Sequence, residues 1–475
     1  MKTRNTILRT LAALVLPVLV AACSTSTTPI ISTPFVPPAG AILKDTIHGP
    51  LHGILLKDST YYMDADVIIP AGDTILMQEG VTLIVLCGPS YFPEIQMMGT
   101  FISMGTQAKP NYITVPASKR TYANLTAGLW GGIQCGAAPS GDLILHWTHI
   151  EFAGGAGNGL AGAATGQKYS IWFQNPTSNF IMEDSWLVGG VDDPVRVSGG
   201  KVSIFRNVFE AGAGGPQNTS GDGFNMKAGT TGDVAYNLFV GECTNGPKIA
   251  NKGGGAIQAN VNIYNNTIIT GGWRFNGAGA RAGSINIEDG GRGAVYNNLI
   301  VNCHTGFRLY NSPTAADTAH TYYDYQWNYA ATAAIDSEFY TRDDANCVEK
   351  VQPHDIHGAV GANDPMFVNY NVKGIDLATY PLSFTFPVAW AAQDPAENVT
   401  NSSRFSDIAS KNINYDFHLA TNSPCVGKAF TGPAPVTIPM ALCPAKSAAN
   451  PYGASPKGLG ADFGAYQMDG SGNLQ

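Results

Sequence analysis

The amino-acid sequence predicts an all-β fold: a right-handed, single-stranded parallel β-helix with an asparagine ladder and a C-terminal cap. Related phrases recur about every 30 residues between Phe180 and Cys303, and each combines two short strands with a polar bend. Apolar and polar residues alternate with a period of two, whereas helical i, i+3, i+4 spacing is rare after the N-terminal segment. Glycine supplies 55 of the 475 residues, as expected of a chain that turns often. Short strands in repeats of this length are typical of stacked β-helix coils.

The bend of each repeat carries a polar residue between two apolar strands. The clearest copies are VNIYNNTIITGG (Val261–Gly272) and AVYNNLIVNC (Ala294–Cys303). Alignment of all copies on this centre gives one column: Asp184, Asn207, Asn237, Asn266 and Asn298. Successive members differ in sequence number by 23, 30, 29 and 32. Asparagine is disfavoured in strands, but it tolerates the left-handed conformation of a sharp bend, and its amide both donates and accepts hydrogen bonds. We therefore predict a hydrogen-bonded ladder that runs along this bend.

The β-helix is predicted to extend over residues 43–470. Its N-terminal part contains strand–turn–strand phrases such as DVIIPAGDTILMQEGVTLIV (Asp66–Val85) and GTFISMGTQAKPNYITV (Gly99–Val115). The pattern loosens over residues 312–412, where we expect irregular coils and loops. Residues 413–470 are predicted to form a closing coil and a cap, because an open end of a β-helix exposes unpaired strand edges.

Residues 1–22 form a targeting segment rather than part of the fold. Three basic residues (Lys2, Arg4 and Arg9) precede a short apolar stretch, Leu11–Val20, and VAAC ends the segment at Cys23. This ending is similar to the lipobox of bacterial lipoproteins, and the similarity implies cleavage before Cys23 and a covalent lipid on its thiol. An ordinary signal peptide is the alternative. Residues 23–42 would then be a flexible tether, and the outer membrane would be the location, with its periplasmic or outer surface left open.

Charge and cysteine spacing exclude several classes of site. The net charge is −8 and basic residues do not cluster, so nucleic acid is not expected as a partner. Seven cysteines follow Cys23, and no two of them have the spacing of a metal-binding pair. We therefore predict no metal site and no cofactor other than the lipid on Cys23. A disulfide between Cys425 and Cys443 is left open.

Alternation along the strands predicts which polar side chains point out of the coils. In PVRVSGG, for example, Val195 and Val197 would face the core and Arg196 the outside. The ligand-binding residues predicted in this way are Arg196, Asn225, Lys227, Gln258, Asn286, Glu288 and Arg308. Arg196, Lys227, Gln258 and Glu288 differ in sequence number by 31, 31 and 30, which predicts one stacked row. A polysaccharide could lie along this row, or the row could be only a solvated ladder of surface charges.

Catalysis on this face has two candidate forms. A polysaccharide lyase needs a base and cations that neutralise a uronate carboxylate; Lys227 is a candidate base if its pKa is lowered, with Arg196 and Arg308 as the cations. A glycoside hydrolase needs two carboxyl groups beside one bond. Asp222, Glu288 and Asp289 are the candidates, but no sequence motif supports them. The catalytic residues are therefore left unassigned.

Several phrases together resemble a known family. They include AGDTILMQEGVTLIV, LWGGIQCGAAP, VDDPVRVSGGKVSIFRN, YNNTIITGGWR and, near the C-terminus, NSPCVGKA followed by GADFGAYQ. They resemble the right-handed parallel β-helix lipoproteins common in Bacteroidetes, and the resemblance covers about Asp66 to Gln467. It implies the fold but no catalytic residues.

These observations predict a lipid-anchored cell-envelope protein that binds glycans or has a structural role without catalysis. A polysaccharide lyase or glycoside hydrolase that acts on the outward face is one alternative. A scaffold subunit of an outer-membrane protein complex is another. The expected partners are thus the membrane, through the lipid, and either a polysaccharide or an outer-membrane complex.

Overall fold

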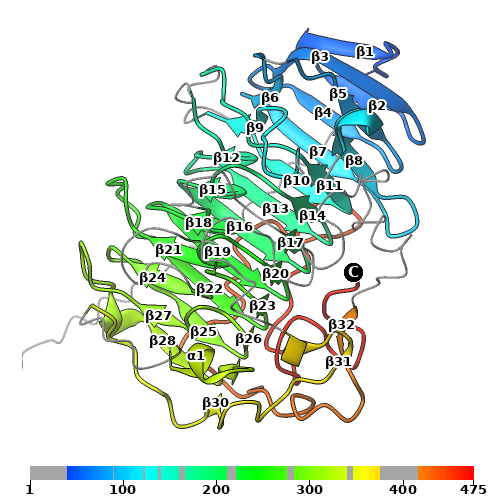
Figure 1. Ribbon diagram of the computed structural model, residues 1–475. Helices are drawn as coiled ribbons and strands as arrows, with labels where there is room; N and C mark the ends of the chain where they lie inside the picture. Colours follow the sequence, from blue (N-terminus) through cyan, green and yellow to red (C-terminus); the bar gives the residue numbers. More distant parts are fainter. Residues whose placement is uncertain are drawn as a thin grey trace, which may run out of the picture. The chain divides into compact units, whose positions relative to one another are not determined.

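The computed structural model describes residues 40–88, 90–120, 124–136, 141–159, 166–210, 221–273, 275, 283–337, 339, 346–374 and 416–475. Over these ranges the chain forms the predicted parallel β-helix, in which strands stack coil upon coil from β1 to β30 (Figure 1). Each middle coil contributes one strand to each of three faces. Cys23, the predicted signal peptide 1–22 and residues 23–39 of the predicted tether lie outside the described residues.

The second strand of each coil belongs to a ten-stranded parallel sheet, which we call the ten-stranded face. Its strands are β2 (Gly53–Leu55), β4 (Thr74–Met77), β7 (Thr100–Met104), β10 (Leu143–His146), β13 (Asn179–Glu183), β16 (Gly200–Phe205), β19 (Thr230–Ala235), β22 (Asn260–Tyr264), β25 (Ala294–Tyr296) and β28 (Tyr322–Asp324).

The first strand of each coil lies on the site face, which carries most of the predicted ligand-binding residues. Its strands are β6 (Glu94–Met97), β9 (Gly132–Cys135), β12 (Ile171–Phe173), β15 (Val195–Val197), β18 (Phe224–Met226), β21 (Pro247–Ala250), β24 (Asn286–Glu288) and β27 (Arg308–Leu309).

The third strand of each coil lies on the third face. Its strands are β5 (Thr82–Val85), β8 (Asn111–Thr114), β11 (Thr148–Glu151), β14 (Trp186–Val188), β17 (Val208–Glu210), β20 (Leu238–Val240), β23 (Thr267–Ile269), β26 (Leu299–Val301), β29 (Trp327–Tyr329) and β30 (Ile356–His357). The long strand β3 (Thr60–Ile69), beside β1 (Thr46–Pro50), pairs with both β5 and β6. It thereby joins the site face and the third face in one 20-stranded sheet.

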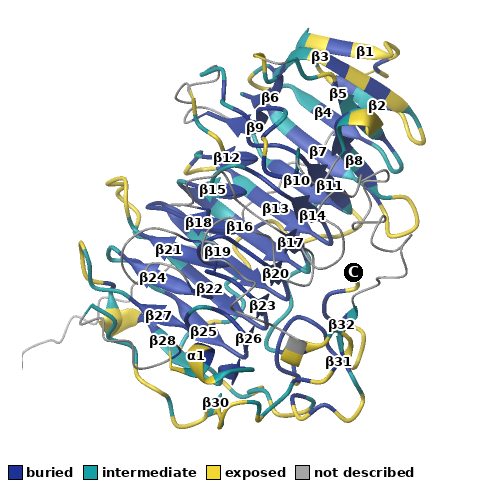
Figure 2. Ribbon diagram, viewed as in Figure 1, coloured by how far each residue is buried: buried dark blue, intermediate teal, exposed yellow. Residues whose placement is uncertain are grey.

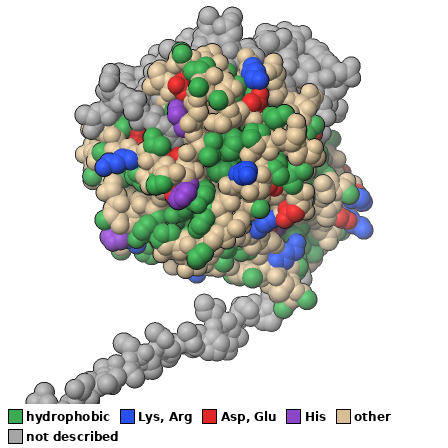
Figure 3. Space-filling model, turned by 90° about the horizontal axis from the view of Figure 1, so that it is seen from below, with side chains coloured by type: hydrophobic (Ala, Val, Ile, Leu, Met, Phe, Trp, Pro, Cys, Tyr) green, Lys and Arg blue, Asp and Glu red, His purple; other side chains and the backbone are tan. Residues whose placement is uncertain are grey.

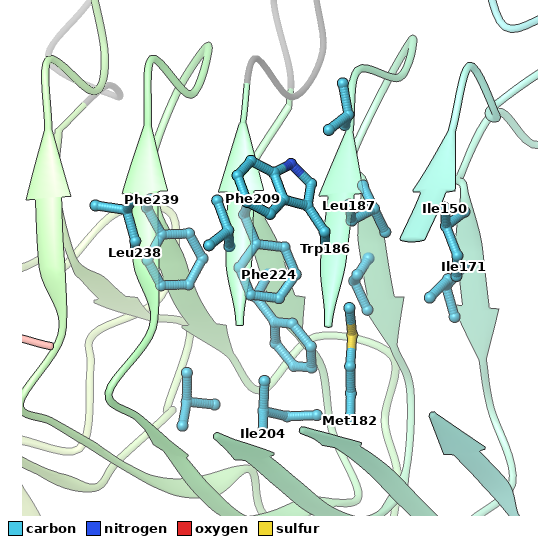
Figure 4. Packing of buried hydrophobic residues seen from close by; sticks show 14 of the residues in the cluster. Ile150, Ile171, Met182, Trp186, Leu187, Ile204, Phe209, Phe224, Leu238 and Phe239 are labelled. Atoms are coloured by element: carbon cyan, nitrogen blue, oxygen red, sulfur yellow. The ribbon is translucent and has the colours of Figure 1, made fainter. Parts of the chain in front are cut away.

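The core fills the inside of the coils with equivalent side chains from successive turns. One inward column on the site face consists of Val197, Met226, Ile249, Ile287 and Leu309, none of them more than 2% exposed. From the third face, Phe209 and Phe239 stack at 4.8 Å between ring centroids (Figure 4). Figure 2 shows that the strands of the middle coils are mostly buried, with single partly exposed positions such as the centre of β15, whereas β1 and β3 alternate between buried and exposed residues.

The predicted asparagine ladder runs along the bend between the ten-stranded face and the third face. The Oδ1 atoms of Asn237, Asn266 and Asn298 each accept a hydrogen bond from the backbone N–H of the ladder residue one coil earlier, at 2.9–3.0 Å. The side-chain amides of Asn207, Asn237 and Asn266 donate to the same oxygens at 3.0 Å. All four asparagines are completely buried, so the ladder satisfies polar groups that water cannot reach.

Two details of the predicted ladder are wrong. Asp184 is not a member: Ser185 takes the position, and its N–H donates to Asn207 Oδ1 at 2.9 Å. The phrase MEDSW offers adjacent polar residues, and the alignment on the polar centre selects one residue too early. The left-handed bend also belongs to the preceding residues rather than to the ladder. Their φ angles are 52° at Asp184, 59° at Arg206, 58° at Tyr236, 48° at Asn265 and 58° at Asn297.

Short elements close the last coil. Helix α1 (Ala333–Asp336) lies at the β27–β28 end of the coils and buries Ile335 in the core (Figure 1). The 3₁₀ turns are η1 (Ala117–Lys119), η4 (Thr318–His320) and η5 (Val372–Gly374). Among the described residues, no helix is both long enough and apolar enough to cross a bilayer.

Residues 413–470 are predicted to form a closing coil and cap. The residues described from 416 to 475 lie largely along the outside of the coils. Strand β32 (Asp416–Leu419) pairs with β31 (Phe367–Asn369). Residues 430–475, which we call the strap, then follow the ten-stranded face from β25 back to β13. Phe430 O accepts from Asn297 Nδ2, and Ser455 N–H donates to Glu183 Oε1. The strap then returns along the ladder bend.

Candidate functional site

The polar row of the site face differs in register from the predicted row. The strands pair Arg196 with Asn225, Asn225 with Lys248, Lys248 with Asn286, and Asn286 with Arg308. The predicted row of Arg196, Lys227, Gln258 and Glu288 is therefore wrong. Successive members of the observed row differ in sequence number by 29, 23, 38 and 22, because the loops between coils differ in length. The nearly constant spacing of the predicted row does not follow any one column.

Three of the predicted residues lie outside this row. Lys227 directly follows β18, and Glu288 pairs with Ala250 rather than with Lys248. Gln258 lies before β22 of the ten-stranded face, where its amide donates to Gly290 O at 2.6 Å and to Asp317 Oδ2 at 2.9 Å. Asp289 has a φ of 51° and forms a turn after β24. Gln258 and Asp289 are thus held by local structure.

The side chains of the row point out of the coils, but most of them are buried. Asn225, Lys248 and Arg308 are 3%, 5% and 1% exposed, and Asn286 is completely buried. Arg196 is the exception, with 29% of its side chain exposed. The prediction of open, solvated side chains is therefore wrong for most of the row, since loops and neighbouring side chains cover it.

A cavity of about 170 Å³ opens beside Arg196 and is lined by charged groups from three coils. We call it the charged pocket. Its lining residues are Asp192, Asp193, Arg196, Asp222, Asn225, Lys227, Thr244, Asn245, Lys248 and Lys252. The volume corresponds to roughly six water molecules in the liquid. The pocket therefore has room for about one sugar-sized group.

Two buried carboxylates meet at Asn225. Its Nδ2 donates to Asp193 Oδ2 at 2.7 Å and to Asp222 Oδ2 at 2.8 Å, so a single amide nitrogen holds the two oxygens close together. Asp193 Oδ1 also accepts from the backbone N–H of Asp222 at 2.9 Å. The pair is thus oriented by one amide and held by the turn before β18.

The two carboxyl groups have opposite pKa shifts. Burial, together with the negative charge of Asp222, raises the pKa of Asp193. Burial also opposes ionisation of Asp222, but Lys248 and hydrogen bonds from Thr244 and Asn245 outweigh it and lower the pKa of Asp222. Neutral Asp193 can therefore supply a proton, while Asp222 stays ionised.

A chain of polar contacts continues from the pocket along the buried row. Lys248 Nζ lies 3.5 Å from Asp222 Oδ2 and 2.9 Å from Glu288 Oε1. Glu288 Oε2 accepts from Asn286 Nδ2 at 2.8 Å, and Asn286 Oδ1 accepts from Arg308 Nε at 3.0 Å. Burial would raise the pKa of Glu288, but the Lys248 ammonium outweighs this and lowers it. Glu288 is therefore an ion-pair partner of Lys248 rather than a free acid.

Among the described residues that line the pocket, Lys227 is a buried cation without an ion pair, whereas Lys252 is exposed. Lys227 is only 6% exposed, and within the described ranges its Nζ makes no hydrogen bond and no ion pair. Burial, with the nearby charges of Lys248 and Arg196, lowers the pKa of Lys227 to about 8. An amine with this pKa exists in both protonation states near neutral pH, as a general base must.

Sequence reasoning missed six lining residues of the pocket: Asp192, Asp193, Thr244, Asn245, Lys248 and Lys252. The pair Asp192–Asp193 is typical of a turn, although Asp193 also meets Asp222 across a coil. Lys248 carries the same strand alternation as Arg196, in the phrase GPKIAN, and correct alignment of β21 would have found it. Asn245 has no such signal, because it lies on a loop. Within the described ranges no three His, Cys, Asp or Glu side chains are arranged to hold a metal ion, and Cys425 and Cys443 are free thiols.

Comparisons of the chain with protein-family models, with curated proteins and with solved structures found no match. The resemblance to β-helix lipoproteins stays a prediction from the sequence phrases. Functional assignment therefore depends on the geometry of the site.

Proposed function

We propose that this protein is a cell-envelope glycan-binding protein that takes a carboxylate-bearing sugar residue into the charged pocket. The buried, unpaired ammonium of Lys227 is the observation that carries this proposal, because a cation held away from water favours an anionic partner. Arg196, at the partly exposed edge of the pocket, offers a second cation. Its guanidinium donates to Tyr169 Oη at 2.8 Å and lies over the Tyr169 ring, which orients it.

The size of the pocket favours one sugar unit of a longer chain. A cavity of about 170 Å³ cannot enclose an oligosaccharide, so the rest of the glycan would extend past Arg196 and Lys252 at the edge. Lipid attachment at Cys23 and an outer-membrane location belong to the same proposal, and they rest on the N-terminal sequence alone.

A polysaccharide lyase is the second candidate, favoured by the lowered pKa of Lys227. The neutral amine would take the proton from the carbon next to the uronate carboxylate. The C–O bond at the neighbouring carbon would break as the C=C bond forms. Asp193, whose pKa is raised to about 7, would give a proton to the leaving oxygen from its protonated form. The reaction thus needs no oxidant or further reactant.

Calorimetric titration of the full-length protein with trigalacturonate tests the binding proposal. We expect saturable binding that weakens with added salt, and a loss of at least tenfold in affinity in Lys227→Met. The exposed Lys350→Met serves as the matched control and should bind normally. Failure to bind any of a panel of uronate oligosaccharides, or undiminished binding by Lys227→Met, would refute the proposal. The scaffold hypothesis would then be the one that remains.

The pH dependence separates binding from elimination. Lys227 loses its charge as the pH rises through about 8, so affinity for an anionic ligand should fall there. A lyase would show the opposite slope, because the neutral amine is the active base, and its rate should rise as the pH approaches 8. Ultraviolet absorbance of the unsaturated product follows the rate. If the unchanged protein forms unsaturated products and Lys227→Met forms none, the protein is a lyase.

A further inference from the structure

A second hollow lies on the ten-stranded face, where the strap reaches β13. It has a volume of about 520 Å³, three times that of the charged pocket. Coil residues from β4 to Arg206 form one side and strap residues Lys446–Ser455 the other. We call it the strap cleft. None of its lining residues belongs to the charged pocket.

The floor of the strap cleft is charged but internally neutralised. Arg206 donates to Asp184 at 2.7 and 3.1 Å and to Glu183 Oε2 at 3.0 Å. His146 lies beside them, and burial lowers its pKa to about 3, so its imidazole is neutral. Its Nε2 is buried without a hydrogen-bond partner among the described residues. That nitrogen is therefore available to a hydroxyl group or a water molecule that enters the floor.

The bend described above places side chains in this cleft. Trp147, Asp184 and Arg206 have left-handed φ angles of 46°, 52° and 59°, and all three line the cleft on successive coils. A left-handed conformation is uncommon for a residue as bulky as tryptophan. Trp147 is only partly buried and lines the cleft, as does Tyr452 of the strap.

The rim combines amides with balanced charges. Gln78 and Gln107 offer donors and acceptors, and Lys57, Lys446 and Glu79 carry the rim charges. With the floor included, three cations face three carboxyl groups. Because the sum is zero, the cleft has no electrostatic preference for an anion. Leu76 and Met104 add apolar surface between the polar groups.

We propose that the strap cleft binds a neutral oligosaccharide of two or three sugar units. Sugars present hydroxyl groups at their edges and C–H groups on their faces, which match amides and aromatic rings respectively. The volume lies within the range of pockets that hold small ligands. This site is independent of the charged pocket, so the protein would contact a neutral and an acidic part of a glycan at separate faces.

Calorimetry on the full-length protein in detergent tests this with cellotetraose, xylotetraose, maltotetraose and mannotetraose. We expect at least one to bind, with an affinity unchanged by salt because the sugar is neutral and the charges that line the cleft sum to zero. Trp147→Asn, which keeps a residue tolerant of the left-handed bend, should weaken binding at least tenfold. Lys227→Met, in the other pocket, is the control and should bind normally.

A second variant guards against a folding defect in Trp147→Asn. Gln107→Ala combined with Tyr452→Ala changes only exposed or partly exposed rim side chains, and it should also lose at least tenfold in affinity at an unchanged melting midpoint. Absence of binding by all four neutral tetrasaccharides overturns the proposal. Binding that survives the rim variant, or that is lost in Lys227→Met, also overturns it.

Discussion

At the bend between the ten-stranded face and the third face, one residue makes the turn and the next makes the hydrogen bonds. Asn265, with a φ of 48°, makes the left-handed turn, and Asn266 supplies the hydrogen bonds to neighbouring coils. The ladder and the inward direction of residues such as Val197 could be predicted from sequence, because both follow from local alternation. The lowered pKa of Lys227 could not, since it arises from Lys248 and Arg196 on other coils as well as from burial.

The ladder predicts a large effect for one buried amide. Asn266 Nδ2 donates to Val234 O and to Asn298 Oδ1, and its own Oδ1 accepts from Asn237. Asn266→Ala leaves these buried groups unpaired, so we expect the free energy of unfolding to fall by about 1–3 kcal/mol. Denaturant unfolding measures the change. Asn371→Ala, at an exposed position, should have little effect; an equal loss in both variants would remove the special role of the ladder.

At the scale of elements, the pairing register of the strands and the path of the strap determine which side chains are in contact. The sequence predicts that strands repeat, but not which residues pair, because loop lengths between coils vary independently of the strands. The charged pocket depends on that register. The sequence therefore predicts that charged side chains lie on this face, but not which of them line the same pocket. The path of the strap was not predicted, since contacts such as Gln475 Nε2 to Ser185 O join residues 290 positions apart.

Asp233 is the clearest attachment point of the strap. Its Oδ1 accepts from the N–H of Met440 at 2.9 Å, and its Oδ2 from the N–H of Ala441 at 3.0 Å. We expect Asp233→Ala to lower the melting midpoint and to make residues 430–458 more sensitive to limited proteolysis, because two backbone donors lose a charged acceptor. Asp469→Ala, in the exposed part of the strap, is the control. Unchanged cleavage in Asp233→Ala would show that other contacts hold the strap.

At the scale of the whole molecule, charged side chains are few. On the face seen in Figure 3, charged side chains are scattered among apolar and neutral groups rather than gathered into a patch. The sequence predicts the composition behind this view, with 13% charged residues. It does not predict that the polar row of the site face is covered, because that depends on how loops fold over the coils.

The predicted membrane attachment depends on a single atom, the sulfur of Cys23. Cys23→Ala removes the thiol that would carry the lipid, so we expect the variant to incorporate no fatty-acid analogue and to leave the membrane fraction. Cys443→Ala, at a buried free thiol, controls for the loss of a cysteine. Labelling of Cys23→Ala at the level of the unchanged protein would exclude the lipoprotein assignment.

The strap also has a consequence for the order of folding. In a stack of coils each turn contacts only its neighbours, so such a stack can unravel from an end, one turn after another. Here the strap follows the coils in sequence and crosses them from β25 to β13, so it can dock only after those coils exist. Once docked, it joins separate turns into one cooperative unit, which must release the strap before any of its turns can open.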